Sequence, residues 1–303
     1  MSDFVSPFWS YYVTVITVAS IIACAVLLWV NSTQRKGGKA ELHGHVWDED
    51  LQEYNNPLPR WWSGLFYITV IFALIYLAVY PGLGGYKGTF GWSSTGQYDK
   101  EMADAKAKFD PIFNKYLAQD LKAVAANTEA KQVGERLYLT YCIQCHGSDA
   151  RGAKGFPNLT DGDWLWGGET DQIKLTIAEG RNGVMPPHAH LGAEVIKDVA
   201  HYVRSLNGKL TFDAARAQRG KETFQSAGCV ACHGADAKGM LALGAPNLTD
   251  EIWLYSSNEA TIVETITKGR NNRMPAFKEF LGDAKVHLLA AYVYGLSQGA
   301  PKK

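Results

Sequence analysis

The feature that most constrains this chain is a block of nearly 90 residues that occurs twice. A C-x-x-C-H pentapeptide begins at Cys142 and another at Cys229, 87 residues later. The pentapeptide "PNLTD" follows each copy, and then come "GRNGVMPP" and "GRNNRMPA", whose methionines Met185 and Met274 are 89 residues apart. A repeat at a nearly constant spacing predicts two related domains that arose by duplication.

The C-x-x-C-H pentapeptides predict covalent attachment of haem c. In this pattern two thiols form thioethers with the haem vinyl groups, and the next histidine binds the iron. A C-x-x-C pair alone could also be a redox or zinc site, but the histidine in both copies disfavours these alternatives. We therefore expect two covalently bound haem c groups, with thioethers at Cys142, Cys145, Cys229 and Cys232 and iron ligands at His146 and His233.

Each copy resembles a class I cytochrome c domain, over residues 132–208 and 209–303. The resemblance implies a small all-α fold in which an N-terminal helix ("GERLYLTYC", "GKETFQSAGC") crosses a C-terminal one. Segments of this length bury little core by themselves, and a haem would supply the missing part.

The distal iron ligands are expected at Met185 and Met274. They occupy equivalent positions downstream of the haem motifs, where cytochrome c domains carry this ligand. His188 and His190 compete for the first iron, which would then be bound by two histidines. They have no counterpart in the second copy, so a solvated or partner-facing loop is the alternative reading.

Two further pairs at repeated positions are candidates for contacts with the haem propionates. Trp164 and Trp253 could donate an indole N–H, and Arg181 and Arg270 could offset the carboxylate charge. Core packing is the alternative for the tryptophans, and a solvated loop charge is the alternative for the arginines.

Two runs near the N-terminus carry no Asp, Glu, Lys or Arg. Each can form a helix of about 20 residues, which crosses a bilayer core, and aromatic residues flank both runs. A cleaved signal peptide is the alternative for the first run, but no basic residue precedes it and no small-residue cleavage site follows. We expect a membrane anchor over residues 1–86, with transmembrane helices at about 9–30 and 61–83.

The basic residues predict the orientation of the anchor. The segment before the first run has no Lys or Arg, whereas the loop between the two runs has Arg35, Lys36, Lys39 and Arg60, so this loop should be cytoplasmic. Both termini would then lie in the periplasm, where haem c is attached, and the chain would be a two-pass protein of the bacterial inner membrane. Residues 87–131 read as a periplasmic tether with a helical segment broken at Pro111.

The predicted ligands favour electron transfer over catalysis. An iron with histidine and methionine ligands has no vacant position, and the two apolar runs contain no histidine that could hold a membrane haem or copper. We therefore expect no catalytic residue in this chain. Lys plus Arg and Asp plus Glu number 30 each, so charge gives no indication of a nucleic-acid partner.

The stretch "HVWDEDLQEYNNPLPRWW", followed by an apolar run and "YPGLGGYKGTFGWSS", is similar to the N-terminal region of the diheme subunit of cbb3-type cytochrome c oxidase, the CcoP/FixP family. With the two cytochrome domains, the resemblance covers nearly the whole chain. It implies that electrons pass from a periplasmic c-type cytochrome to the monohaem subunit, and then to the haem b and copper centre of the catalytic subunit, where oxygen is reduced and protons are pumped.

The haem-attachment motifs are also compatible with other functions. The chain could be the diheme partner of a periplasmic dehydrogenase or quinol oxidase, a diheme peroxidase, or a haem-bearing assembly or sensor protein. A peroxidase needs an iron that opens readily, so methionine at both distal positions argues against it.

Overall fold

The computed structural model describes residues 4–33, 40–56 and 58–298. It divides into two compact units, Met1–Lys106 and Ala107–Lys303, which we describe separately. The basic residues Arg35, Lys36 and Lys39 of the predicted cytoplasmic loop lie outside the described residues.

The first unit contains two helices that are long and apolar enough to cross a membrane, α1 (Pro7–Thr33) and α2 (Arg60–Val79). They contact each other, and the backbone N–H of Gly85 donates a 2.7 Å hydrogen bond to Ser10 Oγ, which ties the chain after α2 to the start of α1. The second helix ends about one turn before the predicted residue 83, because Tyr80 leaves helical geometry and Pro81 follows it.

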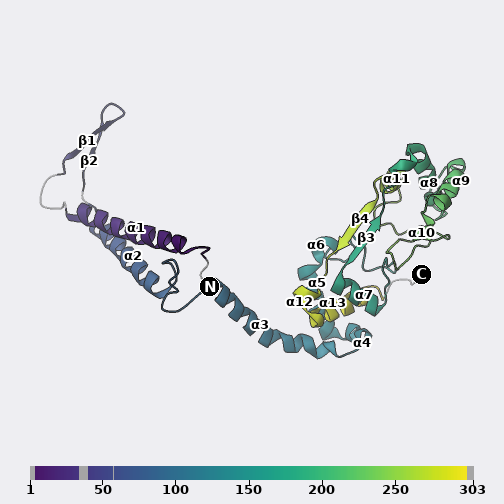
Figure 1. Cartoon of the computed structure of the whole chain (residues 1–303), viewed down its shortest axis with the longest axis horizontal. Coiled ribbons are helices and arrows are strands. Elements are labelled where there is room, and N and C mark those ends of the chain that lie inside the picture. The colour runs from purple at the N-terminus through teal and green to yellow at the C-terminus, as the bar shows by residue number, and fades with distance from the viewer. Residues whose placement is uncertain (1–3, 34–39, 57, 299–303) are drawn as a thin grey trace. The chain divides into compact units, whose positions relative to one another are not determined.

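A β-hairpin that the sequence did not predict lies between α1 and α2 (Figure 1). Strand β1 (Leu42–Trp47) pairs antiparallel with β2 (Leu51–Tyr54), and all of their side chains are exposed. Asp48 and Glu49 form the turn, with positive φ angles of 47° and 74°. Asp48 and Glu49 therefore lie at the tip of an exposed hairpin.

Helix α3 (Ser94–Leu117) runs through Pro111, so the predicted break at this proline is wrong. A proline inside a helix removes one hydrogen bond, and the neighbouring bonds with packing at Phe113 and Tyr116 keep the helix continuous. Helix α4 (Leu121–Ala126) follows, and the Asp120 carboxylate caps it by accepting hydrogen bonds from the first-turn N–H groups.

The rest of the second unit is mostly helical, which confirms the predicted class. Its helices are α5 (Thr128–Tyr141), α6 (Ile143–His146), α7 (Thr170–Glu179), α8 (Ala193–Ser205), α9 (Ala214–Ser226), α10 (Val230–His233), α11 (Glu259–Lys268), α12 (Lys278–Leu281) and α13 (Asp283–Leu296), with a 3-10 turn at Ala189–Leu191. Two short strands, β3 (Arg181–Met185) and β4 (Arg270–Met274), pair antiparallel, with Arg181 opposite Met274 and Met185 opposite Arg270.

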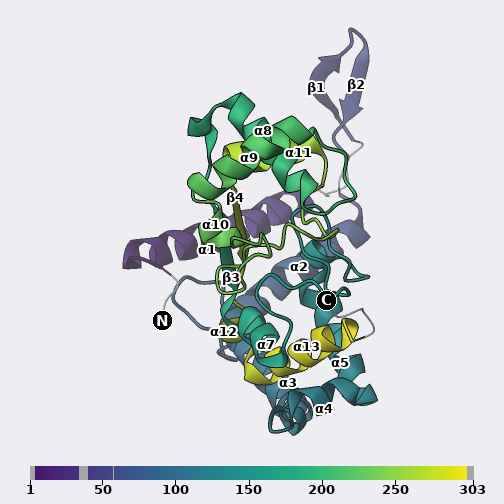
Figure 2. The same cartoon turned by 90° about the vertical axis from the view of Figure 1, so that its right-hand side faces the viewer.

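These elements form two bodies joined at β3 and β4 (Figures 1 and 2). The first body consists of α4, α5, α6, α7, α12 and α13, and the second consists of α8, α9, α10 and α11. We expected the N-terminal helix of each repeat to cross the C-terminal helix of the same repeat. Instead α5 of the first repeat packs on α13 of the second, and α8 of the first packs on α9 of the second. Each body is therefore built from both repeats.

Candidate functional site

Each C-x-x-C-H motif lies on a single helical turn. In the first, the N–H groups of Cys145 and His146 donate to the carbonyl of Cys142 at 3.3 and 3.0 Å. In the second, His233 donates to the carbonyl of Cys229 at 3.0 Å. Residues three and four apart share one face of a helix, so both thiols and the imidazole of each motif face the same way.

The histidines of the two C-x-x-C-H motifs are oriented by backbone carbonyl groups. His146 Nδ1 lies 3.0 Å from the carbonyl oxygen of Pro157, and His233 Nδ1 lies 3.1 Å from that of Pro246. Burial lowers the pKa of both imidazoles, although the hydrogen bond to the proline carbonyl opposes this effect. A neutral imidazole that donates from Nδ1 has a free lone pair on Nε2, which is the form that binds a metal.

The first cysteine of each motif is partly shielded from water. Burial raises the pKa of Cys142 to about 11, and burial also raises the pKa of Cys229. Both side chains are partly buried against the core of a body, Cys142 in the first and Cys229 in the second. The apolar surroundings that shield these thiols are those that a hydrophobic porphyrin edge needs.

A mostly apolar cavity of about 730 Å³ runs along both motifs. Its lining includes both histidines, both motif cysteine pairs and both candidate methionines. Two thiols, an imidazole and a thioether around an apolar cavity match the requirements of haem c: covalent attachment, a proximal ligand and a distal ligand. The residues present therefore fit the group that the motifs predict.

The structure brings each candidate methionine to a different body. Met274 packs into the core of the first body with Tyr138 and Cys142. Met185 packs into the core of the second body with Phe224 and Cys229. Each methionine therefore lies beside the haem motif of the other repeat.

The two competing histidines also fall in the second body, although the sequence had suggested them for the first iron. The backbone N–H of His188 donates a 2.9 Å hydrogen bond to the carbonyl of Ile266 on α11. Its Nδ1 is buried with no hydrogen-bond partner among the described residues, and its ring is close enough to His233 to help lower the pKa of that imidazole. His190 is exposed.

The predicted propionate contacts have other partners in the structure. Trp164 and Trp253 are half-buried and pack against the cores of the first and second body. Arg181 donates from Nε to the hydroxyl of Thr176 at 2.9 Å, and Arg270 donates to the hydroxyl of Thr265 at 2.7 and 3.0 Å. Both arginines line the cavity, so their positions remain compatible with a propionate.

Sequence reasoning missed the aromatic rings beneath these arginines. The guanidinium carbon of Arg181 lies 4.9 Å from the ring centre of Trp166, and that of Arg270 lies 4.2 Å from the ring centre of Tyr255. Trp166 and Tyr255 are 89 residues apart, so the repeat itself could have identified them. A cation over an aromatic face is stabilised by the ring quadrupole, which fixes each guanidinium at the cavity wall.

Two small helical bodies, each with a C-x-x-C-H turn and a methionine facing an apolar cavity, define the chain as a c-type cytochrome. A family model described as "Cytochrome C oxidase, cbb3-type, subunit III" matches residues 129–203 and 215–293. A second, described as the N-terminal domain of the cbb3 cytochrome oxidase protein FixP, matches residues 39–87.

Curated relatives match over nearly their whole length. The chain is 52% identical to the cbb3-type cytochrome c oxidase subunit CcoP of Rubrivivax gelatinosus, over 98% of each protein. It is 41% identical to the subunit FixP of Bradyrhizobium sp. (strain ORS 278), over 84% of this chain and 94% of that protein. It is 36% identical to CcoP of Cereibacter sphaeroides, over 89% of this chain and 99% of that protein.

The chain belongs to the CcoP/FixP family, subunit III of cbb3-type cytochrome c oxidase. It is therefore a subunit of an oxidoreductase complex of respiratory electron transport.

Proposed function

We propose that this chain holds two covalently attached haem c groups and relays electrons within the oxidase. The thioethers form at Cys142, Cys145, Cys229 and Cys232, and the axial ligands are His146, His233, Met185 and Met274. The observation that carries this proposal is the cavity that both motifs and both methionines line. When bound, each haem supplies a reversible one-electron centre.

The residues of this chain set the conditions for that electron transfer. Histidine and methionine together leave no open position on the iron, which suits transfer without substrate binding, and a thioether ligand raises the reduction potential. Arg181 and Arg270, held over their aromatic rings, place positive charge at the cavity wall, where they can neutralise the propionates. Trp164 and Trp253 can donate to the same groups through the indole N–H.

The partners follow from the family. Electrons would enter from a periplasmic c-type cytochrome, either soluble or attached to the membrane, and leave to the monohaem subunit and the catalytic subunit with its haem b and copper. Helices α1 and α2 would anchor the chain in the lipid of the bacterial inner membrane. The segment between them would be cytoplasmic, supported by Arg60 at the start of α2, and both termini and the haem-bearing bodies would be periplasmic.

Purification of the intact complex tests this proposal. We expect haem b and copper to co-purify with the chain, and intact-mass measurement to show the addition of two haems. Replacing Cys142 and Cys145 with alanine should remove one haem, and replacing Cys229 and Cys232 should remove the other. A chain that carries fewer than two haems, or that purifies without haem b and copper, would contradict the proposal.

A further inference from the structure

We propose that His188 donates a hydrogen bond from Nδ1 to the thioether sulfur of Met185 and so raises the reduction potential of the haem in the second body. This inference rests on the proposed function, because it assumes that Met185 binds a haem iron there. It adds a positioning residue to that site: His188 does not bind the iron but acts on it through the methionine.

The first argument is the unpaired nitrogen of His188. Its Nδ1 is buried and has no hydrogen-bond partner among the described residues. The side chain lines the mostly apolar cavity together with Met185 and His233. A buried polar atom without a partner costs free energy, so folded proteins nearly always supply one. We therefore expect this nitrogen to find its partner within the filled haem site.

The second argument is the choice of acceptor. His233 is not available, because its Nδ1 lies 3.1 Å from the carbonyl oxygen of Pro246 and its Nε2 is the atom that would bind the iron. The sulfur of Met185 keeps a lone pair that the iron does not use, and a thioether sulfur is a weak hydrogen-bond acceptor. Met185 precedes His188 by three residues and lines the same cavity. We therefore assign the sulfur to Nδ1.

A haem propionate is the other acceptor that the filled site would contain. The donors proposed for the propionates are the tryptophan and the arginine at repeated positions, and both repeats carry them at the cavity. His188 occurs in one repeat only. The propionates are therefore supplied with donors in both bodies without this histidine.

The equivalent position of the first body is held in the same way but carries a side chain that cannot donate. Phe277 lies 89 residues after His188 in the sequence. The backbone N–H of Phe277 donates a 3.1 Å hydrogen bond to the carbonyl of Ile177, and that of His188 donates a 2.9 Å hydrogen bond to the carbonyl of Ile266. Because the two backbones are attached alike, the side chains at this position are directly comparable.

Tyr138 does not replace the missing donor in the first body. It lines the cavity and packs in the same core as Met274, but its hydroxyl donates to the carbonyl of Gly147 at 2.8 Å. A phenol has a single O–H to donate, so this one is already used. The two haem sites therefore differ in the donor beside their methionines.

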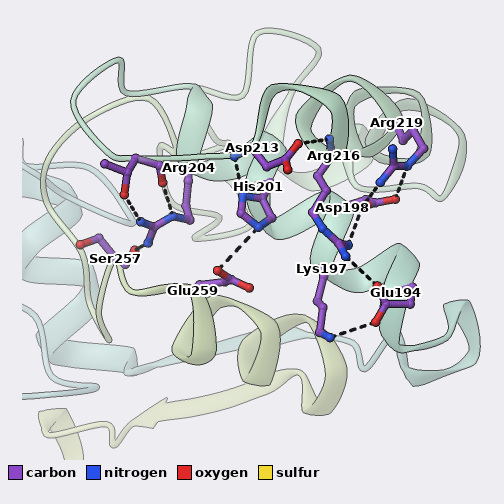
Figure 3. A network of polar contacts seen from close by, with 11 residues as sticks. Glu194, Lys197, Asp198, His201, Arg204, Asp213, Arg216, Arg219, Ser257 and Glu259 are labelled. Carbon is purple, nitrogen blue, oxygen red and sulfur yellow. Dashed lines mark hydrogen bonds and ion pairs between the residues drawn. The ribbon is translucent and has the colours of Figure 1, made fainter.

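The loop that carries His188 is fixed on both sides. Before it, β3 is hydrogen-bonded to β4. After it, α8 is bound to α9, because the buried Asp198 accepts hydrogen bonds from Arg216 at 2.8 Å and from Arg219 at 2.7 and 2.9 Å (Figure 3). A donor on a fixed loop is oriented before its acceptor is bound, which is what a residue that tunes a metal ligand requires.

The direction of the effect follows from the electron density on the sulfur. Ferric iron withdraws more electron density from a sulfur ligand than ferrous iron does, so the sulfur accepts a hydrogen bond better in the reduced state. The hydrogen bond therefore stabilises the reduced haem and raises its potential. A net hydrogen bond changes an equilibrium by about two- to tenfold. For one electron, tenfold corresponds to about 59 mV.

The experiment uses the full chain with both haems attached. His188→Phe gives the second body the residue of the first and removes the donor. His188→Asn keeps a donor, because the amide nitrogen of asparagine is separated from Cβ by the same number of bonds as Nδ1 of histidine. His190→Phe, at the exposed neighbouring histidine, is the control. The readouts are the weak far-red absorption of the methionine–iron bond in the oxidised protein and the reduction potential of each haem.

We expect His188→Phe to shift the far-red absorption of one haem and to lower its potential, so that its ratio of reduced to oxidised form at a fixed potential falls by about two- to tenfold. The other haem should be unchanged. His188→Asn should restore most of both effects, and His190→Phe should behave like the unaltered chain. Recovery with asparagine would not be expected if His188 only filled space, because phenylalanine fills that space better.

The other outcomes separate this inference from the proposed function. A lowered potential with an unchanged far-red absorption would assign His188 to a propionate and overturn its contact with Met185. No change in either readout would also overturn the inference, and would leave methionine ligation intact. A far-red absorption with the intensity of only one haem in the unaltered chain would contradict the proposed ligation of both irons.

A second measurement does not depend on the stability of the variants. In the reduced, unaltered chain with labelled histidine nitrogens and methionine methyl groups, the methyls of the ligand methionines shift strongly upfield in the NMR spectrum. The Nδ1–H of His188 should exchange slowly with water and show cross-relaxation with the upfield methyl of Met185. Rapid exchange, or a contact with neither upfield methyl, would overturn the proposal.

Discussion

The two bodies share one architecture but differ in the side chains at their helix crossings. At the α5–α13 crossing, Leu288 is fully buried among apolar neighbours that include Ala130 and Val133. At the α8–α9 crossing, the equivalent of Leu288 is Asp198, which is bound by two arginines. The first crossing takes its stability from hydrophobic burial, whereas the second also takes its choice of partner from charge.

The largest effect is expected when the two arginines of α9 are replaced by the residues at the equivalent positions of α5. The double variant Arg216→Ala with Arg219→Val leaves the carboxylate of Asp198 buried without a cation, and should lower the melting temperature of the second body by roughly 5–10 °C. Adding Asp198→Leu should recover most of the loss, because an apolar crossing like the first would replace the ionic one. Melting is followed by circular dichroism in the haem region. No recovery in the triple variant would show that the charges are not what distinguishes the two crossings.

Alanine substitution of the glycine at each crossing, Gly134 or Gly220, should lower the stability of both bodies in the same way. A Cβ at Gly134 would lie 2.7 Å from Tyr292 Cβ and 2.9 Å from the carbonyl oxygen of Leu288, and one at Gly220 would overlap the backbone of Asp198. Alanine at either position should destabilise its body by about 1–3 kcal/mol, measured by denaturant unfolding. The neighbouring exposed Lys221→Ala is the control and should have little effect. An equal effect of Lys221→Ala would attribute the loss to the helix and not to the crossing.

Low pH should destabilise the α8–α9 crossing more than the α5–α13 crossing. The hydrogen bond from Arg219 is the main cause that lowers the pKa of Asp198 in the folded chain. A carboxyl with a lowered folded pKa contributes stability above its unfolded pKa, about 3.9, and loses it as the pH falls through the folded value. Below about pH 4 the second body should therefore lose stability relative to the first. The Asp198→Leu triple variant should lack this difference in an acid titration of the two haem signals.

The smallest effect concerns charge beside the cavity. Arg270 lies 3.5 Å from the carboxylate of Glu264, whereas Leu175 occupies the equivalent position near Arg181. Removing a negative charge favours the reduced haem, so Glu264→Leu should raise the potential of the second haem by less than about 59 mV, because Glu264 is partly solvated. Leu175→Glu should lower the potential of the first haem. A redox titration checks both, and shifts of the same sign would contradict the assignment of these residues to different haems.

The sequence predicted what the repeats have in common and missed how they are joined. The C-x-x-C-H turns, the apolar runs and the paired methionines follow from local spacing, and the structure forms the corresponding helices. The packing of α5 on α13 and of α9 on α8 does not follow from local spacing. The N-terminal helices of both repeats carry similar apolar patterns, so either could cross either C-terminal helix. The only local indication was Asp198, a charged residue among the apolar positions of α8 whose partners lie 18 and 21 residues away.

Two smaller features, the β1–β2 hairpin and the continuity of α3 through Pro111, were also not predicted from the sequence. The β1–β2 hairpin is fully exposed, so it lacks the alternation of apolar and polar residues that marks a half-buried strand. Pro111 sits in a helix that packing at Tyr116 maintains, so tertiary contacts outweigh the local preference.

The strand pair β3–β4 also has a consequence for the order in which the protein matures. Met274 packs against the same core as Cys142 but follows His146 by 128 residues, so a chain exported from its N-terminus would expose the first C-x-x-C-H motif long before this methionine. Met185 packs against the same core as Cys229 and precedes it in the chain, so it would already be present when the second motif is made. Contacts between such distant segments form slowly. A haem joined to Cys142 and Cys145 would therefore have no methionine beside it until almost the whole chain had been exported.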